Sequence, residues 1–211
     1  MIHMPAVIYV ATSNPGKLRD FRGAASRLGV EIQTLPDFKN LPLAIEDGQT
    51  FEANARIKAE HYSRFLPGAL VLADDSGLAV DALNGAPGVH SARYAAVLQG
   101  DAGHQNSDDD ENNRVLIEQL KALPDDNRSG KFVCVIAAAK DGVTQQTFNG
   151  EVRGKLLTAP RGTQGFGYDP LFYFPALGKT FAEICAEEKA EYSHRGKAFR
   201  GFLAWYAKAR A

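Results

Sequence analysis

The sequence predicts an α/β protein whose sheet begins with parallel strands, and two observations support this. The chain of 211 residues is 45% hydrophobic and contains 20 glycines, which is typical of a globular domain. Its first 35 residues give an apolar strand pattern, a capped helix and a second strand pattern, the order of a β-α-β unit. We expect a single domain over residues 1–211, built as one body or as two closely packed lobes.

The elements of the first half follow from apolar runs and their boundary residues. Residues 6–11 form an apolar strand pattern, and Asn14 and Pro15 are suited to the N-cap and first position of a helix that ends at Gly29. A second strand is predicted over residues 30–35. Thr50 then caps a helix over residues 51–65, which Pro67 and Gly68 end.

Two adjacent aspartates follow the next strand pattern. Residues 69–73 are apolar and lead into Asp74 and Asp75, and a turn is predicted at Ser76 and Gly77 before a second short apolar run. Carboxylates at the end of a buried strand are rigidly held and can face a cleft, as a hard-metal ligand or a general base does. The alternative is a solubilising turn, so the remaining motifs have to decide.

The second half contains further strands and helices. We expect a helix capped by Ser107 and running to Leu120, followed by a strand over residues 131–139. A hairpin turn at Asp141 and Gly142 should lead into strands over residues 143–148 and 151–153. The chain should then form a short helix over residues 180–189 and a final helix capped by residues 193–195 and running through Tyr206.

Charge and cysteine content exclude some classes of protein. The 24 Lys and Arg and 25 Asp and Glu residues are interleaved and give a net charge of −1, which argues against a nucleic-acid-binding surface. Cys134 lies in an apolar strand pattern, so we expect a buried reduced thiol rather than a disulfide with Cys185, and the spacing supports no zinc site.

The sequence also bears on location. No segment approaches the roughly 20 apolar residues that cross a bilayer. Residues 1–5 lead directly into a strand pattern and lack the charged start and cleavage site of a signal peptide. We therefore expect a soluble, cytoplasmic protein.

The turn between the first strand and the first helix is a candidate phosphate site. The first-turn amides of such a helix point outward, the helix dipole adds positive charge, and Lys17 adds a full charge. The G-x-x-x-x-G-K-[ST] phosphate loop does not occur in the chain. A purely structural strand-to-helix turn is the alternative.

A phosphate site near carboxylates suggests Mg²⁺, which binds a few carboxylates together with phosphate oxygens and water. Glu52, Asp74 and Asp75 are the available ligands, although Glu52 also suits the helix dipole where it stands. An Asp that the metal does not fully occupy can activate water for attack on phosphorus. The sequence contains no nucleophile elbow, so no covalent intermediate is indicated.

The last third contains a candidate base site. Phe166 lies in a glycine-rich loop over residues 162–170 and could stack on a base, while His194 and Arg195 could donate hydrogen bonds to a 6-oxo group. The 6-amino group of adenine is itself a donor, so it could not accept hydrogen bonds from these side chains, and adenine would be disfavoured. For His194 the alternative is an ordinary residue at a helix start.

Taken together, the motifs resemble those of the inosine/xanthosine triphosphate pyrophosphatase family, whose members hydrolyse nonstandard purine nucleotides. The matching stretches occur in the family's order and span nearly the whole chain: TSNPGK at residues 12–17, TFEANARIKA at 50–59, ADDSGLAVDAL at 73–83, GAPGVHSARY at 85–94, GFGYDP at 165–170, and EKAEYSHRGKA at 188–198.

The resemblance implies a two-lobed mixed α/β fold with a long central sheet and an active-site cleft between the lobes. It implies cleavage of ITP, dITP and XTP between the α- and β-phosphates, dependence on Mg²⁺, and a homodimer. By position it makes Asp75 the general base and a metal ligand, with Glu52 as a second metal-site acid and Asp74 close by. The implied substrate-binding residues are Thr12, Ser13, Asn14, Pro15, Gly16, Lys17, Lys58 and Ser76 for the triphosphate, and Phe166, Gly167, Tyr168, Asp169, Lys189, His194 and Arg195 for the base.

Two alternatives stand beside this reading. One is a Maf-like pyrophosphatase of modified pyrimidine or methylated nucleotides, which would have no use for residues 193–195. The other is a nucleotide-binding regulator without hydrolysis, which would need no acidic water-activating residue.

Overall fold

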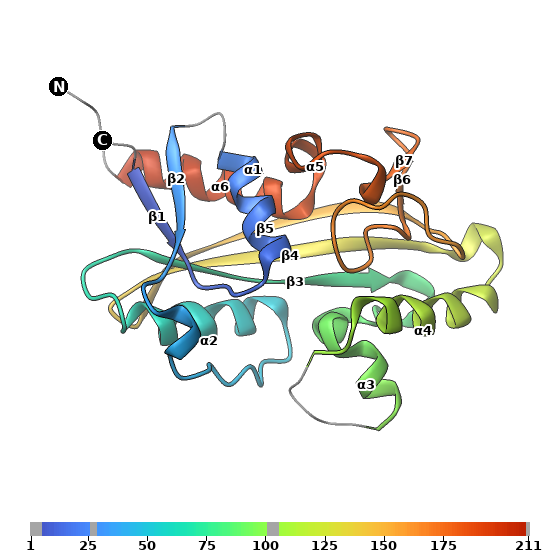
Figure 1. Ribbon diagram of the computed structural model, residues 1–211, viewed down its shortest axis with the longest axis horizontal. Helices are drawn as coiled ribbons and strands as arrows, with labels where there is room; N and C mark the ends of the chain where they lie inside the picture. Colours follow the sequence, from blue (N-terminus) through green and yellow to red (C-terminus); the bar gives the residue numbers. More distant parts are fainter. Residues whose placement is uncertain (1–5, 26–28, 101–105, 210–211) are drawn as a thin grey trace.

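The computed structural model describes residues 6–25, 29–100 and 106–209, and its centre is a seven-stranded sheet of order β2-β1-β3-β4-β5-β6-β7 (Figure 1). The strands are β1 (Ala6–Val10), β2 (Val30–Thr34), β3 (Val71–Val80), β4 (Ser129–Lys140), β5 (Val143–Leu156), β6 (Phe172–Phe174) and β7 (Lys179–Thr180). β1 pairs in parallel with β2 and β3, and every later pairing is antiparallel. The predicted β-α-β start and the mixed α/β fold are confirmed.

Helices cover both faces of the sheet. The α-helices of the described residues are α1 (Pro15–Ala25), α2 (Phe51–Ser63), α3 (Tyr94–Leu98), α4 (Asp109–Lys121), α5 (Ala186–Tyr192) and α6 (His194–Ala209). In Figure 1, α1, α5 and α6 lie above the sheet and α2 lies below it, with α3 and α4 below its other end. The long strands β3, β4 and β5 connect the two ends.

The core follows the alternation of side chains along the strands. On one face, Leu72 and Ile136 pack with Phe21 of α1 and Phe199 of α6. On the other face, Ala73 and Val135 pack with the helix α2. Successive residues of β3 therefore lie against different helices, which matters for the two aspartates in this strand.

The turn expected at Ser76 and Gly77 is wrong. Both residues lie inside β3, where Ser76 pairs with Cys134 and Gly77 with Val133 in an antiparallel ladder that runs from Val71 to Val80. Ser-Gly is typical of turns, but this ladder supplies the backbone hydrogen bonds that a turn would otherwise have to make. Asp74 and Asp75 are thus central in a strand rather than at its end.

Three other expectations change in detail. β5 is one continuous strand, Asp108 rather than Ser107 is the N-cap of α4, and the helix expected over residues 180–189 divides into a 3₁₀ turn (Phe181–Glu183) and α5. The side chain of Asp108 accepts from the amide of Asp110, while Ser107 Oγ accepts from the amide of Ala96 instead. Part of the end expected for the first helix, residues 26–28, lies outside the described residues.

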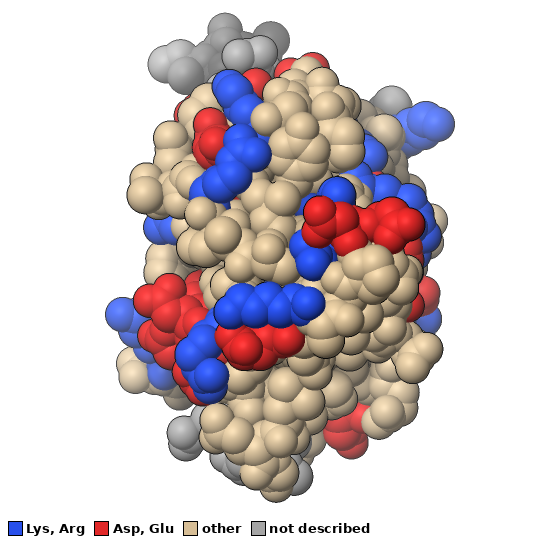
Figure 2. Space-filling model, turned by 90° about the vertical axis from the view of Figure 1, so that its right-hand side faces the viewer, with Lys and Arg blue, Asp and Glu red and all other residues tan. Residues whose placement is uncertain are grey.

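Cysteines and charges agree with expectation in the described part of the chain. Cys134 is buried and Cys185 exposed, and both are free thiols. Figure 2 shows Lys and Arg side chains next to Asp and Glu side chains on one face of the molecule, rather than a surface of a single sign. Among the described helices none is long and apolar enough to cross a membrane; the prediction for residues 1–5 lies outside that range.

Candidate active site

The turn after β1 begins the site. Thr12 Oγ1 accepts from the amide of Asn14 at 3.1 Å, and Asn14 Oδ1 accepts from the amide of Lys17 at 3.0 Å. The second bond is an N-cap, as expected for Asn14. In the described part of the chain, the last two residues of β1 pair with Val71 and Leu72 of β3. The start of α1 lies beside β3, where Lys17 Nζ donates to the carbonyl of Asp74 at 3.3 Å.

Asp74 and Asp75 point to opposite faces of the sheet, because neighbouring residues of a strand alternate. The cations that pair with Asp74 come from α1 and α6, whereas the cation that pairs with Asp75 comes from α2. The two aspartates are adjacent in the sequence, but in the structure their side chains lie in two different environments.

Asp74 is buried between two cations. Its Oδ2 lies 3.2 Å from Lys17 Nζ and 3.1 Å from Arg195 Nη2, and the same Arg195 nitrogen donates to Ser76 Oγ at 2.7 Å. Burial alone would raise the pKa of Asp74, but the charges of Lys17, Arg195 and Lys58 outweigh it and hold the pKa well below its usual range. Asp74 is therefore a permanent anion.

The ion pairs continue away from Asp74 as a buried chain of alternating charges. Arg195 Nη1 also bonds Asp20, Asp20 lies 3.4 Å from Lys189 Nζ, and Lys189 bonds Asp169 at 2.6 Å. The side chains of these four residues are each at most 7% exposed. Together with Asp74 and Lys17, this network of ion pairs contains three carboxylates and three cationic side chains, so the formal charge of the network is zero.

Asp75 has a separate set of partners on α2. Its Oδ1 accepts from Lys58 Nζ at 3.0 Å and its Oδ2 from Asn54 Nδ2 at 3.3 Å. Lys58 is shared with Glu46, 2.6 Å away. Burial raises the pKa of Asp75 and the charge of Lys58 opposes that rise without cancelling it. Asp75 is thus a more basic carboxylate than Asp74.

Glu52 lies at the start of the same helix but does not bond Asp75. Its side chain is 54% exposed, accepts from Thr147 Oγ1 at 3.5 Å and lies 3.8 Å from Arg56. Its metal role stays a prediction. Glu46, by contrast, pairs with the same Lys58 ammonium as Asp75 does. Glu46 was not among the residues selected from the sequence.

The loop that contains Phe166 packs on the start of α1. A Cβ on Gly16 would lie only 2.4 Å from the Phe166 ring, so glycine is what allows the ring this close. Lys189 Nζ lies 4.9 Å from the centre of that ring and the Arg195 guanidinium 5.6 Å. The structure therefore brings the predicted phosphate turn and base residues together.

Two further loop residues have structural partners. Asp169 Oδ2 accepts from the amide of Phe166 at 2.9 Å. Tyr168 is buried in the core, and its hydroxyl donates to the carbonyl of Ser91 at 2.8 Å. These contacts hold the loop on the molecule.

His194 is buried at the start of α6 and stacks on Phe132, with 4.7 Å between ring centres. Burial, together with the charges of Arg195 and Lys189, lowers the pKa of His194 well below its usual value, so the ring is neutral. Its Nδ1 is buried and has no hydrogen-bond partner among the described residues. A buried polar atom without a partner is unfavourable, and it is available to a ligand.

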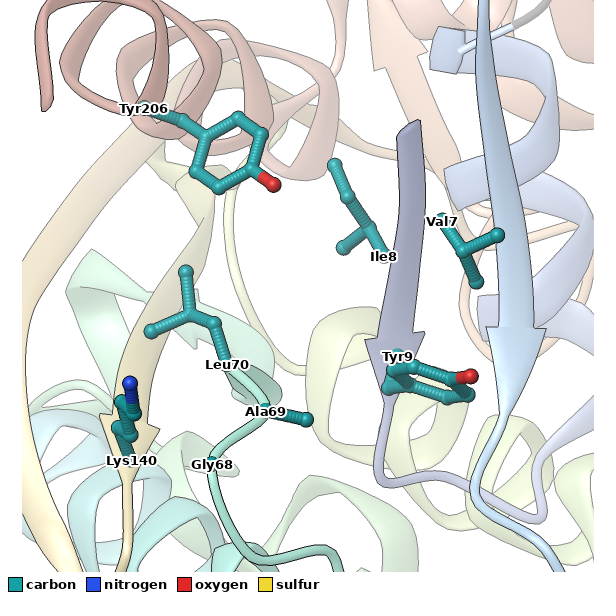
Figure 3. Close-up of a pocket in the computed structure, with 8 residues that line it drawn as sticks. All are labelled: Val7, Ile8, Tyr9, Gly68, Ala69, Leu70, Lys140 and Tyr206. Carbon is teal, nitrogen blue, oxygen red and sulfur yellow. The ribbon is translucent and has the colours of Figure 1, made fainter. Parts of the chain in front are cut away.

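Two surface hollows lie away from these residues. One of about 370 Å³ lies between β1 and the loop before β3 (Figure 3), and one of about 310 Å³ lies near the ends of β4 and β5. Neither is lined by a predicted site residue. At the candidate site, the ion-paired side chains and the Phe166 ring pack against one another. The active-site cleft that the resemblance implies stays a prediction.

No group of three or more metal-ligating side chains occurs in the described part of the chain. Asp75 and Glu46 nevertheless converge on one ammonium group, that of Lys58. Two carboxylates that share a cation suit Mg²⁺, which keeps water and takes phosphate oxygens as its other ligands. Both carboxylates pair with Lys58 in this structure, so their role as Mg²⁺ ligands stays a prediction.

Comparison with known proteins identifies the family. The model of the Ham1 family matches residues 8–205, nearly the whole chain and all the site residues above. The chain belongs to the Ham1 family.

Two named proteins and a solved structure are similar to this chain over more than nine-tenths of their own lengths. A protein of Acidobacterium capsulatum named dITP/XTP pyrophosphatase is 51% identical over 95% of this chain and 98% of its own, and one of Thermus thermophilus with the same name is 45% identical over 94% and 91%. The solved Ham1 protein of Coxiella burnetii has a TM-score of 0.78 at 38% identity, covering 96% of this chain and 99% of its own. The resemblance stated from the motifs is confirmed.

Proposed function

We propose that this Ham1-family protein hydrolyses nonstandard purine nucleoside triphosphates, ITP, dITP and XTP, to the monophosphate and pyrophosphate. The activity would clear deaminated purines from the nucleotide pool. One arrangement carries the proposal beyond the names of the relatives. Lys17 Nζ donates to the carbonyl of Asp74 at 3.3 Å and its charge also acts on the neighbouring carboxylate of Asp75, while the Phe166 loop packs on the turn that contains Lys17.

In this proposal Asp75 is the general base. Its raised pKa makes it a stronger base than an ordinary aspartate, and the charge of Lys58 favours its ionised form. Asp75 takes a proton from a water molecule, the water oxygen forms a bond to the α-phosphorus, and the bond from that phosphorus to the bridging oxygen breaks. Pyrophosphate leaves with the electron pair.

Mg²⁺ would be held by Asp75 together with Glu52, as the motifs imply, or with Glu46, which shares Lys58 with Asp75. When bound, the ion would neutralise phosphate charge and orient the attacked group. The position of Glu46 favours it as the second carboxylate.

Thr12, Ser13, Asn14, Pro15, Gly16, Lys17, Lys58 and Ser76 are proposed to bind the triphosphate. The free amides and positive dipole end of α1, with Lys17 beside them, suit an anion. Phe166, Gly167, Tyr168, Asp169, Lys189, His194 and Arg195 are proposed to form the base site. The buried Nδ1 of His194 supports this, since a base could supply its missing partner.

A hydrolysis panel tests the function. ITP, dITP, XTP, GTP, ATP and UTP are each incubated with and without Mg²⁺, and pyrophosphate and orthophosphate are measured separately. We expect pyrophosphate from the first three substrates only, and only with Mg²⁺. Orthophosphate as the first product would contradict α–β cleavage, and equal turnover of UTP would favour the Maf-like alternative.

A homodimer and a cytoplasmic location complete the proposal. The dimer is supported by the family resemblance. Light scattering at micromolar concentration would measure the mass directly, and a monomer mass would contradict the dimer. Fractionation of cells would test the location.

A further inference from the structure

α4 holds one residue of the Phe166 loop by both of its backbone groups. Asp109 Oδ2 accepts from the amide of Gly167 at 2.8 Å, and Asn113 Nδ2 donates to the carbonyl of Gly167 at 2.9 Å. Asp109 and Asn113 lie four residues apart on α4 and so share one face of the helix. Neither was selected from the sequence.

The two bonds act on the backbone next to Phe166. Gly167 has a positive φ of 58°, a conformation that few residues other than glycine adopt. Fixing its amide and its carbonyl fixes the peptide units on both sides, and with them the direction in which the Phe166 side chain leaves the backbone. The adjacent Tyr168 is anchored separately, to the carbonyl of Ser91.

The orientation of the Asn113 amide is determined by this contact. Its Oδ1 is buried and finds no hydrogen-bond partner among the residues that the structure describes. Turning the amide over would place that oxygen against the carbonyl oxygen of Gly167, so the bond from Nδ2 would be lost as well. The bond to Gly167 is therefore the one that decides how Asn113 is placed.

We propose that Asn113, together with Asp109, is a positioning residue that sets the Phe166 ring at the angle needed to stack on the purine base. The inference rests on the proposed function, in which Phe166 contacts the base. It adds that the base site depends on α4, a helix outside the motifs that predict that site. The α1 side of the loop, where Phe166 meets Gly16, provides the opposite support.

The test compares Asn113→Asp and Asn113→Leu with the wild-type chain. Both variants are close to Asn in size and lack the N–H donor. The matched control is Arg114→Ala, which alters the adjacent residue of α4, whose side chain is exposed and pairs with Glu111. Dissociation constants are measured by calorimetry for inosine monophosphate and for inorganic tripolyphosphate, which has no base, and kcat and KM are measured for ITP.

We expect inosine monophosphate to bind roughly tenfold more weakly to both variants, the size expected for one lost hydrogen bond to a fixed group. KM for ITP should rise by a similar factor while kcat stays within about twofold and tripolyphosphate binding is unchanged. A merely structural role would weaken both ligands equally. Asp109→Ala, at the exposed start of α4, provides a second variant if those at Asn113 do not fold, and should act in the same direction.

A double-mutant cycle with Phe166→Ala decides whether Asn113 acts through the ring. In that background the Asn113→Leu change should have no further effect on inosine monophosphate binding. Unchanged binding in the single variants, or a full effect without the ring, would overturn this inference while leaving the function intact. If the wild-type chain itself neither binds inosine monophosphate nor hydrolyses ITP, the proposed function fails and this inference fails with it.

Discussion

Asp74 and Asp75 are chemically identical neighbours that the sheet makes into different acids. Asp74 meets Lys17 and Arg195 on one face, and its pKa is held low. Asp75 meets Lys58 on the other face, and burial leaves its pKa raised. The first is suited to holding cations in place and the second to accepting a proton.

Replacing each aspartate by asparagine should therefore give different results. Asp75→Asn removes the proposed base, so kcat for ITP should fall by about 10²–10⁴ while nucleotide binding and thermal stability change little. Hydrolysis is followed by pyrophosphate release and binding by calorimetry. Wild-type hydrolysis in this variant would show that Asp75 is not the base.

Asp74→Asn should mainly destabilise the fold. Removing the charge of Asp74 takes from Lys17 its carboxylate partner and leaves Arg195 paired with Asp20 alone, and breaking a buried ion pair costs about 3–5 kcal/mol. The free energy of unfolding is measured by urea denaturation, with Asp75→Asn as the matched control. A stability equal to that of the control would contradict the structural role given to Asp74.

His194 gives a pH-dependent contribution to stability. Its pKa is lowered in the folded state, so the unfolded chain binds the proton more tightly. The contribution is fully present above the unfolded pKa of about 6.5 and is lost as pH falls toward the folded value. Between pH 7 and pH 5 the free energy of unfolding should fall less steeply in His194→Gln than in the wild-type chain. Parallel profiles would contradict this.

Residue-level prediction from the sequence succeeded where a residue lies in a recognisable pattern. Asn14 caps its helix as expected, and Asn54 and Lys58, four apart on α2, both reach Asp75. Asp20 and Glu46 were missed. Asp20 sits in an ordinary helical pattern and Glu46 in a loop, and their cationic partners, Lys189 and Lys58, lie 169 and 12 residues away in the chain.

At the level of elements, β3 and the start of α1 matter most. β3 was expected to turn at Ser76 because local preference favours a turn there, but ten residue pairs with β4 override it. The pairing partner lies about 60 residues further along the chain, so local reading of the sequence could not anticipate it. α1, whose boundaries depend on its own cap, was predicted correctly at its beginning.

Gly16 tests the contact between α1 and the Phe166 loop. In Gly16→Ala the new Cβ would overlap the Phe166 ring, at 2.4–2.9 Å from its carbons, and displace it. We expect KM for ITP to rise by roughly tenfold or more, because the ring loses its position over the base. The helix itself should not weaken, since Ala favours helices over Gly.

Gly201→Ala on α6 is the matched control. The nearest atom to its new Cβ would be 3.7 Å away, an ordinary contact. This variant should keep the wild-type KM and become slightly more stable, by about 0.5–1 kcal/mol. If both glycine variants keep the wild-type KM, the Phe166 ring does not need its place against α1.

For the whole molecule, the order of motifs was enough to indicate the fold. Six motifs in the order of one family imply a shared structure, and the family match and the Ham1 structures confirm it. The hairpin predicted at Asp141 and Gly142 is confirmed by the antiparallel pairing of β4 with β5, but the sequence did not indicate that β3 also pairs with β4 along its whole length. That feature depends on register between distant segments.

Stability and activity should respond differently to Mg²⁺. Chelation with EDTA should abolish hydrolysis but leave the melting temperature unchanged, because Asp75 and Glu46 each already pair with the Lys58 ammonium. A non-hydrolysable ITP analogue with Mg²⁺ at about 100 times its Kd should raise the melting temperature by roughly 5–10 °C. A large drop in melting temperature with EDTA alone would mean that the ion is part of the fold.

The division of β3 into two faces has a consequence for protein engineering. Helix α2 supports the proposed reaction from one side of the strand, and α1, α5 and α6 support the charge chain from the other. Substitutions that redesign which base is accepted could therefore be combined with substitutions that alter turnover. Their free-energy effects should add where the substituted residues share no partner, whereas substitutions at Lys17 or Lys58 should couple with those at the aspartates, because both charges act on Asp74 and on Asp75. A mutant library could then vary the residues on each face of β3 separately, and the best variants from the two faces could be combined.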